Sequence, residues 1–296
     1  MEKSPYFALI ISIISVSFAA ILIVSVSDDV SSLTIAYYRL FFTVLFLAPI
    51  VFFIKKNRED LVKVDLRKLL YMIGIGIILA FHFAFWISSL KLTSVASSVI
   101  LVTAHPVLVA PVAHFFFKEK LTLVNIFGIS ISLFGVVVLV LGNYGLGDLS
   151  IDSIEGNVLA ILGGIAAGLY ILGGRRLRSS NVSVFSYAFI VYSTSSIVLL
   201  IMCLITNSKL SGISFQDYQL LILMAFISGI LGHTLYNWTL KHIRASVASV
   251  ALLGEPLGST FLAFVIPRIN QTPSNYTLIG GIIIISGIYL TAKRKK

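Results

Sequence analysis

The stretch SVASSVIL at Ser94–Leu101 decides the fold, because nearly the same letters, SVASVALL, return at Ser246–Leu253. The two copies lie 152 residues apart. Further identical pairs occur at this offset: Trp86 with Trp238, Gly128 with Gly280, and Gly135 with Gly287. Matches that persist over roughly fifty residues at one offset predict that the chain holds two copies of one ancestral unit.

The composition places both copies in a membrane. Of 296 residues, 58% are hydrophobic and 11% are charged, whereas soluble domains are about 45–50% apolar and about 25% charged. The mean hydropathy is +1.01. No soluble core needs this much apolar surface, so the chain is predicted to be an integral membrane protein.

Ten apolar runs are long enough for a helix that crosses a bilayer, which takes about 20 residues. The predicted spans are 5–26, 33–54, 69–90, 95–117, 121–142, 156–174, 183–206, 217–240, 245–267 and 276–293. The predicted fold class is therefore an all-α membrane protein with ten transmembrane helices.

The basic residues predict the orientation. With the N-terminus inside, the inner segments hold 18 of the 22 Lys and Arg residues, and the outer segments hold Lys91, Lys209 and Arg268. Cytoplasmic loops collect Lys and Arg, so both termini are predicted to be cytoplasmic. The same rule accounts for the net charge of +10. We therefore expect the lipid bilayer of the cell membrane, and not nucleic acid, as the partner of the basic surface.

The spans divide into two halves. We expect a first five-helix repeat at 1–142, an extracytoplasmic linker at 143–155, and a second five-helix repeat at 156–296 with a basic cytoplasmic tail. Five is an odd number, so the second repeat enters the membrane from the opposite side. This predicts an inverted-topology repeat, with one copy of the repeated stretch starting a helix at each membrane surface, as alternating access requires.

Two further motifs carry a family resemblance. HPVLVAPVAHFFFKEKLT at His105–Thr122 places a Pro and Glu119 before the fifth span, and LLGEPLGSTFLAFV at Leu252–Val265 contains the pair EP. With its ten spans in two halves, the chain resembles the drug/metabolite transporter superfamily in its EamA branch, over essentially its full length. The second half departs from the pattern, with Gln271 where a second Glu is expected. The resemblance implies a permease or exporter of amino acids, metabolites or small drugs.

Among the carboxylates, only Glu255 falls deep inside a predicted span, and Pro256 follows it directly. A proline frees a backbone carbonyl, and transporters place substrate or ion sites where such a broken helix meets a charge at midspan. Glu255 is thus a candidate for binding substrate or a proton, or alternatively a carboxylate that caps a neighbouring helix. His105 with Pro106 occupies the equivalent depth in the fourth span, as a proton carrier, a substrate contact, or a histidine bound to a backbone carbonyl.

Arg39 is the one basic residue inside a predicted span, directly after Tyr38. A guanidinium can receive a substrate carboxylate through two parallel hydrogen bonds. It can equally extend to the outer surface or fix a helix contact. Family members often have an arginine near this place, which the resemblance implies to be structural.

Aromatic and polar side chains complete the set of candidate pocket residues. His82 and Trp86 are four residues apart, as are His233 and Asn237, and each pair is expected to share a helix face. The two tryptophans can alternatively belong to the aromatic belts at the membrane surfaces. The candidates are His82, Trp86, His233, Asn237, Trp238, Tyr38 and Tyr187.

The sequence lacks the motifs that are typical of other function classes. There is no His-Glu-x-x-His sequence, no Cys/His metal spacing around the single Cys203, and no nucleotide-binding glycine loop with Lys. An intramembrane enzyme or a channel is therefore a remote alternative, and neither a metal nor a cofactor is expected. We predict a secondary transporter of amino acids or related metabolites, with efflux of hydrophobic or cationic drugs as the alternative. The expected partners are a small-molecule substrate, the bilayer and a possible second copy of the chain.

Overall fold

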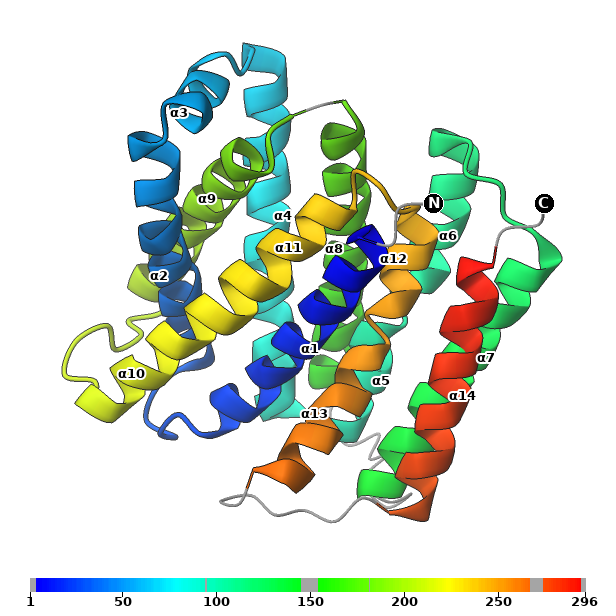
Figure 1. The fold of residues 1–296 in the computed structure, drawn as a ribbon. Helices are drawn as coiled ribbons and strands as arrows, with labels where there is room; N and C mark the ends of the chain where they lie inside the picture. The colour runs from blue at the N-terminus through cyan, green and yellow to red at the C-terminus, as the bar shows by residue number, and fades with distance from the viewer. Residues whose placement is uncertain (1–3, 94, 145–153, 181, 267–273, 294–296) are drawn as a thin grey trace.

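The computed structural model of the chain describes residues 4–93, 95–144, 154–180, 182–266 and 274–293. These residues form helices and turns and contain no strand, which confirms the predicted all-α class (Figure 1). Helix α1 begins and helix α14 ends at one end of the bundle, called the terminus end below; the other end is called the opposite end (Figure 1).

Ten helical segments of the described residues are long and apolar enough to cross a membrane, as predicted. Three of these segments consist of more than one helix. The elements are α1 (Ser4–Val24), α2 (Ser32–Phe53), α3 (Lys55–Val62), α4 (Leu66–Leu92), α5 (Val95–Thr103), α6 (Pro106–Phe117), α7 (Leu123–Tyr144), α8 (Ile154–Ser179), α9 (Val184–Ile205), α10 (Phe215–Met224), the π-helix η2 (Ala225–Thr234), α11 (Leu235–Thr239), α12 (Ala245–Ala251), α13 (Gly254–Val265) and α14 (Asn275–Ala292).

Short polar side chains start several of these helices. The Ser31 hydroxyl accepts a hydrogen bond from the backbone N–H of Thr34 at the start of α2, and Asp65 accepts one from Lys68 at the start of α4. Such caps satisfy backbone donors that the helix itself leaves free. Hydrogen bonds from Lys68 also hold the pKa of Asp65 below its usual range.

The fourth and ninth spans are broken near their middle. The fourth consists of α5 and α6, with His105 at the break and Pro106 as the first residue of α6. The ninth consists of α12 and α13, where Glu255 follows the break and Pro256 comes next. The prolines explain the interruption, because a proline has no backbone N–H to continue the hydrogen-bond ladder of the preceding helix.

The eighth span departs from a regular α-helix. Ten of its residues, Ala225–Thr234, form the π-helix η2 between α10 and α11. The wider π turn changes which residues share a face, and π segments are frequent at functional sites. Inside η2, the Thr234 hydroxyl donates to the Gly229 carbonyl, and the Thr43 hydroxyl of α2 donates to the Ala225 carbonyl.

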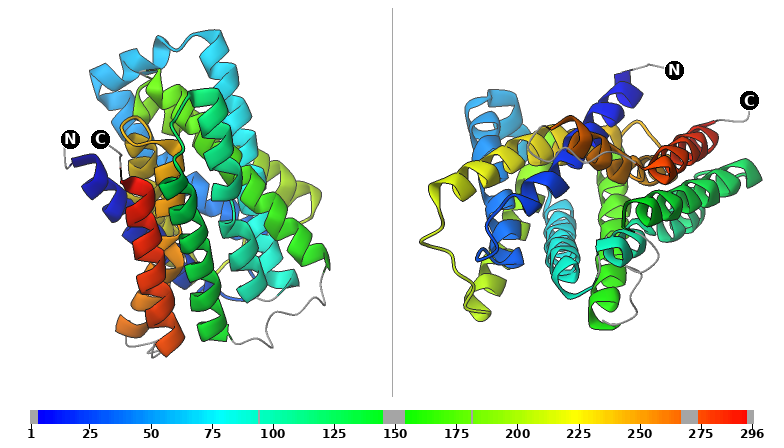
Figure 2. Two further views of the ribbon diagram at one scale, coloured as in Figure 1. Left: turned by 90° about the vertical axis from the view of Figure 1, so that its right-hand side faces the viewer. Right: turned by 90° about the horizontal axis from the view of Figure 1, so that it is seen from below.

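Helices α7 and α14 pack side by side at one edge of the bundle (Figures 1 and 2). Their contact runs through the glycines that recur at the repeat offset. A Cβ atom on Gly280 would lie 2.6 Å from the backbone nitrogen of Leu139, and one on Gly135 would lie 2.8 Å from that of Ile284. The backbones therefore approach as closely as small residues allow in lipid.

The end of the sixth span corrects one expectation. The predicted span stopped at 174, which left Arg175, Arg176 and Arg178 in a loop. Helix α8 instead continues to Ser179, and Arg178 is buried at 3% exposure. Its guanidinium donates to the carbonyls of Asn237 and Val182, so a run of arginines at a span end need not lie in a loop.

Some predicted features fall outside the described residues. They are Ser94 at the start of the first repeated stretch, most of the linker (145–153), and Arg268 and Gln271 in the second half.

We expect Gly280→Ala to lower the thermal stability of the protein, because its methyl group has no room against α7. Overpacking of this kind typically costs about 1–3 kcal/mol. Gly74→Ala is the matched control, since nothing lies within 4 Å of a Cβ atom there. Thermal unfolding of both variants in detergent, followed by size-exclusion fluorescence, measures the difference. Equal midpoints for the two variants would contradict the close packing of α7 and α14.

Candidate substrate site

A cavity of about 1150 Å³ lies between the two halves of the bundle. Its lining residues come from α1, α2, α4, α5, α7, α8, η2, α11, α13 and the turns beside them. At the opposite end the lining includes Asp28 in the turn after α1, Lys91 at the end of α4, and Ser274 before α14. Among the described residues, none of the turns at the terminus end contributes to it. The cavity thus extends from the middle of the bundle toward the opposite end.

Arg39 and Glu255 are the charged residues in the deep part of this cavity. Arg39 comes from α2 and Glu255 from the start of α13, so residues from both halves of the chain meet here. The five ion pairs among the described residues include neither of them. The guanidinium and the carboxylate therefore line the same cavity without forming an ion pair with each other.

The Arg39 side chain is buried at 1% exposure. Its Nε and Nη1 atoms have no hydrogen-bond partner among the described residues. The guanidinium lies 4.6 Å from the centre of the Phe83 ring, a favourable position for a cation over an aromatic face. The arginine is thus held in place by an aromatic ring while its donors stay available.

The backbone around Glu255 is fixed by hydroxyl groups. Its carbonyl oxygen accepts hydrogen bonds from Ser17 at 3.2 Å and Ser259 at 3.0 Å. No ion pair joins the Glu255 carboxylate to a described residue. The helix break before α13 therefore positions a carboxylate on the cavity wall without neutralising its charge.

Aromatic rings form another part of the cavity wall. The rings of His82 and Trp86 stack with centres 5.9 Å apart, as their spacing on α4 predicted. A hydrogen bond of 2.9 Å between His82 Nδ1 and the Gly163 carbonyl fixes the orientation of the pair. His233 of η2 meets the edge of Phe83 with ring centres 5.7 Å apart. The cavity therefore offers flat apolar surfaces together with a few polar atoms.

Unpaired polar atoms are concentrated at this cavity. Buried polar atoms are nearly always hydrogen-bonded in proteins, so an unpaired group marks a place for water or a ligand. Of the residues with such atoms in the described part of the chain, five line the cavity: Ser32, Arg39, Trp86, His105 and Tyr236. Arg39 and Trp86 contribute N–H donors, which suit a ligand with acceptor oxygens.

The structure thus brings together most of the residues singled out in the sequence. Arg39, His82, Trp86, His105, His233, Glu255 and Pro256 all line the cavity. Apart from Trp86, each is a polar or helix-breaking residue inside an apolar span, and such residues face the protein interior because lipid cannot solvate them.

Two other candidates are buried among the helices and do not line the cavity. Asn237 is fully buried and donates to the hydroxyls of Tyr170 at 2.6 Å and Tyr192 at 3.0 Å. Tyr187 is also fully buried, and its hydroxyl approaches Gly174 of α8. Because η2 ends between His233 and Asn237, the first faces the cavity while the second packs against α8 and α9.

Three further candidates do not line the cavity. The Tyr38 hydroxyl donates to the Leu210 carbonyl at 2.6 Å, which ties α2 to the turn before α10. Trp238 is half-buried and contacts the His242 ring, with ring centres 4.7 Å apart. Pro106 is buried in α6 and acts on the backbone as the residue that starts this helix.

The cavity also contains residues that the sequence did not single out. Phe83 and Tyr170 belong to apolar or glycine-rich stretches, where an aromatic residue gives no distinct signal. Asp28 and Lys91 were assigned to loops at a span end, and they line the cavity at its rim. Only the tertiary structure shows that these span ends enclose the same space.

The described residues contain no group of three His, Cys, Asp or Glu side chains that could hold a metal ion.

The comparison with known proteins agrees with this architecture. The sequence model of the EamA-like transporter family matches the chain twice, at residues 3–141 and 154–293. The chain belongs to the EamA-like transporter family. The two matches to this EamA-like transporter model fall on the two halves that contribute Arg39 and Glu255.

Relatives of this EamA-like transporter are similarly named. The chain is 29% identical over 242 residues to the uncharacterized transporter YyaM of Bacillus subtilis, covering 79% of this chain and 76% of that protein. It is 25% identical over 226 residues to an uncharacterized transporter of Archaeoglobus fulgidus, covering 75% and 74%. A solved crystal structure shares the fold with a TM-score of 0.77 at 18% identity, covering 98% of this chain and 96% of the other. The protein is thus a multi-pass transporter of the cell membrane.

The two tryptophans of the chain should report different surroundings. We expect acrylamide, a water-soluble quencher, to reach Trp86 in the cavity and to reach Trp238 much less. Trp238→Phe, which leaves Trp86 as the emitter, should therefore be quenched several-fold more strongly than Trp86→Phe. Stern–Volmer slopes in detergent or nanodiscs measure this. Equal slopes would contradict a water-accessible cavity at Trp86.

Proposed function

We propose that this protein is a secondary transporter that moves small zwitterionic metabolites, amino acids above all, across the cell membrane by alternating access. In this proposal the two five-helix halves form an inverted repeat, and the terminus end is cytoplasmic. The cavity then faces the outside, and a second conformation opens the same site to the cytoplasm.

The two charged residues in the deep part of the cavity, Arg39 and Glu255, carry the proposal. Arg39 offers free N–H donors to a carboxylate, and Glu255 offers a carboxylate to an ammonium group. A zwitterion that contacts both groups neutralises both charges, whereas an anion or a cation alone leaves one charge unpaired in a buried place. Buried charges are costly unless they are paired, so this arrangement favours zwitterions.

The charges at the rim support the same substrate class. The described lining residues include two basic residues, Arg39 and Lys91, and two acidic residues, Asp28 and Glu255. With neutral histidines the formal charge of these described residues is zero, which favours no ion of one sign.

The aromatic part of the cavity wall suits an apolar side chain. His82 and Trp86 form one stacked face, and Phe83 with His233 forms another. Flat rings bind apolar and aromatic groups well, so we expect amino acids with large apolar side chains among the substrates.

Efflux of hydrophobic cations is the alternative, and the size of the cavity favours it. A volume of about 1150 Å³ lies slightly above the usual range of roughly 300–1,000 Å³ for ligand pockets. A lipophilic cation would use Glu255 and the aromatic rings but not Arg39.

Arg39→Gln tests the carboxylate contact in proteoliposomes. We expect phenylalanine uptake to fall roughly 30-fold or more, because a buried charge loses its partner. The substrate analogue phenylalanine amide lacks the carboxylate, and its uptake should change little. Arg176→Gln is the control, since Arg176 lies at the end of α8 over the Tyr71 ring. Equal losses for phenylalanine and its amide would overturn the assignment of Arg39.

Glu255→Gln tests the ammonium contact by the same logic. The variant should lose the preference of the wild-type protein for phenylalanine over N-acetylphenylalanine, whose nitrogen carries no charge. Competition of each compound against labelled phenylalanine measures this preference. If the lipophilic cation tetraphenylphosphonium is transported and depends on Glu255 while phenylalanine is not transported, the drug-efflux alternative replaces our proposal.

A further inference from the structure

Glu119 holds a position that the cavity does not explain. It follows α6, where Lys118 adopts a left-handed backbone conformation with φ of 55°. The Glu119 backbone N–H donates to the Ala113 carbonyl at 3.2 Å, which closes the turn. The turn connects α6 to α7, and Glu119 is buried at 8% exposure.

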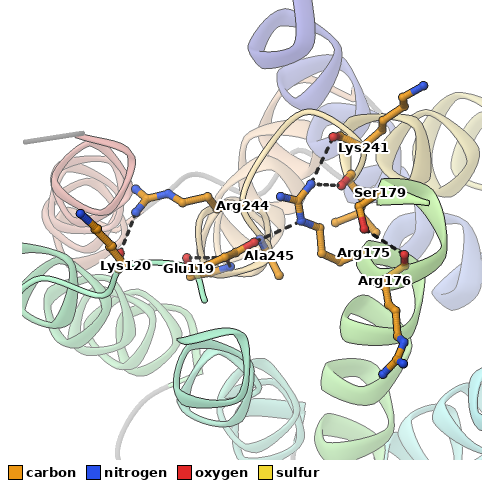
Figure 3. Close-up of polar contacts among 10 residues, drawn as sticks. Glu119, Lys120, Arg175, Arg176, Ser179, Lys241, Arg244 and Ala245 are labelled. Atoms are coloured by element: carbon orange, nitrogen blue, oxygen red, sulfur yellow. Dashed lines mark hydrogen bonds and ion pairs between the residues drawn. The ribbon is translucent and has the colours of Figure 1, made fainter. Parts of the chain in front are cut away.

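The Glu119 carboxylate binds the start of α12 (Figure 3). Its Oε1 atom accepts a hydrogen bond from the Ala245 backbone N–H at 3.0 Å. Its Oε2 atom accepts longer ones, at 3.4 Å, from the backbone N–H and the hydroxyl of Ser246. Ser246 is the first residue of the second repeated stretch, so a carboxylate of the first half satisfies the free donors at the start of this stretch.

Arg175 of α8 completes the contact. Its Nε atom lies 3.1 Å from Glu119 Oε1, and its Nη1 atom donates to the carbonyls of Leu240 and Lys241 at 2.6 and 3.2 Å (Figure 3). The Arg175 and Glu119 side chains are 19% and 6% exposed. Charge-assisted hydrogen bonds that are shielded from water in this way are stronger than neutral ones. We call Glu119, Arg175, Ala245 and Ser246 the Glu119 latch.

The latch binds the helix that lies between the cavity and the terminus end. All seven residues of α12 are buried, and the helix packs against α6, α8 and α14. The latch binds its first residues, while Leu252 and Glu255, just beyond its last residue, line the cavity. Seven residues of helix span about 10 Å, so α12 separates the cavity from the terminus end.

The side chains of α12 carry no charge. Its sequence, ASVASVA, contains only neutral side chains, and all of them are buried. The latch therefore adds contacts with a charged group at the start of a helix that is otherwise held by neutral, buried contacts.

We propose that the Glu119 latch keeps the terminus end of the carrier closed, and that its release lets α12 move and opens the cavity toward that end. Glu119 and Arg175 are then positioning residues for the transport cycle, outside the substrate site. The inference rests on the proposed alternating access, but it does not depend on the identity of the substrate.

Cysteine labelling tests the latch without a substrate. The buried Cys203 is the single cysteine, so Cys203→Ala provides a background free of thiols. Ser249→Cys reports on α12, where Ser249 is fully buried, and Ser259→Cys reports on the cavity wall. Each reporter is combined with Glu119→Gln and labelled with a water-soluble maleimide in nanodiscs, which expose both ends of the protein.

We expect Glu119→Gln to raise the labelling rate of the Ser249→Cys reporter roughly tenfold or more, because the contacts to a charged group are lost. The labelling rate of the Ser259→Cys reporter should fall in the same variant, because opening at one end closes the other. Arg175→Gln should shift both rates in the same directions. Arg176→Gln is the matched control on the same helix, because its side chain points away from Glu119 (Figure 3).

Two results would overturn the latch. Unchanged rates for both reporters in Glu119→Gln would show that the contact does not hold α12. Faster labelling of both reporters would show general loosening of the fold in place of an exchange between two states.

Failure of phenylalanine uptake in the wild-type protein together with the expected labelling shift would refute the proposed substrate and leave the latch supported.

Discussion

Backbone groups in the hydrocarbon core of a membrane find no water, so each must be paired within the protein or face a water-filled space. This constraint produces the long helices of the chain, and it also determines where helices can break. The fourth and ninth spans are interrupted at His105 and just before Glu255. Both residues line the cavity. The breaks therefore place a polar side chain of each half on the cavity wall, and hydroxyl groups of Ser17 and Ser259 pair the Glu255 carbonyl at the second break.

The same constraint explains what the sequence could predict. A charged or polar residue deep in an apolar span has to face the interior, so Arg39, Glu255, His82 and His233 could be assigned to a common site before their contacts were known. The spans were equally clear, since a run of about 20 apolar residues has few other uses. These predictions follow from local sequence, because solvation of a single residue decides them.

Other placements could not be predicted from the sequence, because they depend on contacts between distant segments. The π-helix η2 rotates Asn237 away from the cavity, and the binary pattern of apolar and polar residues does not reveal a π turn. Tyr38 and Tyr187 look like pocket residues in sequence, yet the Tyr38 hydroxyl binds a carbonyl of a distant turn and Tyr187 is fully buried among other helices. Arg178 was expected in a loop, and it is buried because carbonyls of two other segments accept its hydrogen bonds.

Glu119 shows how the two halves differ even though they share a repeated stretch. In the first half this carboxylate pairs with Arg175 and binds the start of α12. At the repeat offset of 152 residues, the second half has Gln271 in place of Glu119, and Ile23 of the first half corresponds to Arg175. An amide carries no charge and isoleucine offers no donor, so the sequence does not repeat the ion pair. Two halves with one fold therefore differ in the polar contacts available at their ends. In the transport cycle that we propose, this asymmetry favours the conformation that forms the ion pair, in which the cavity meets the opposite end.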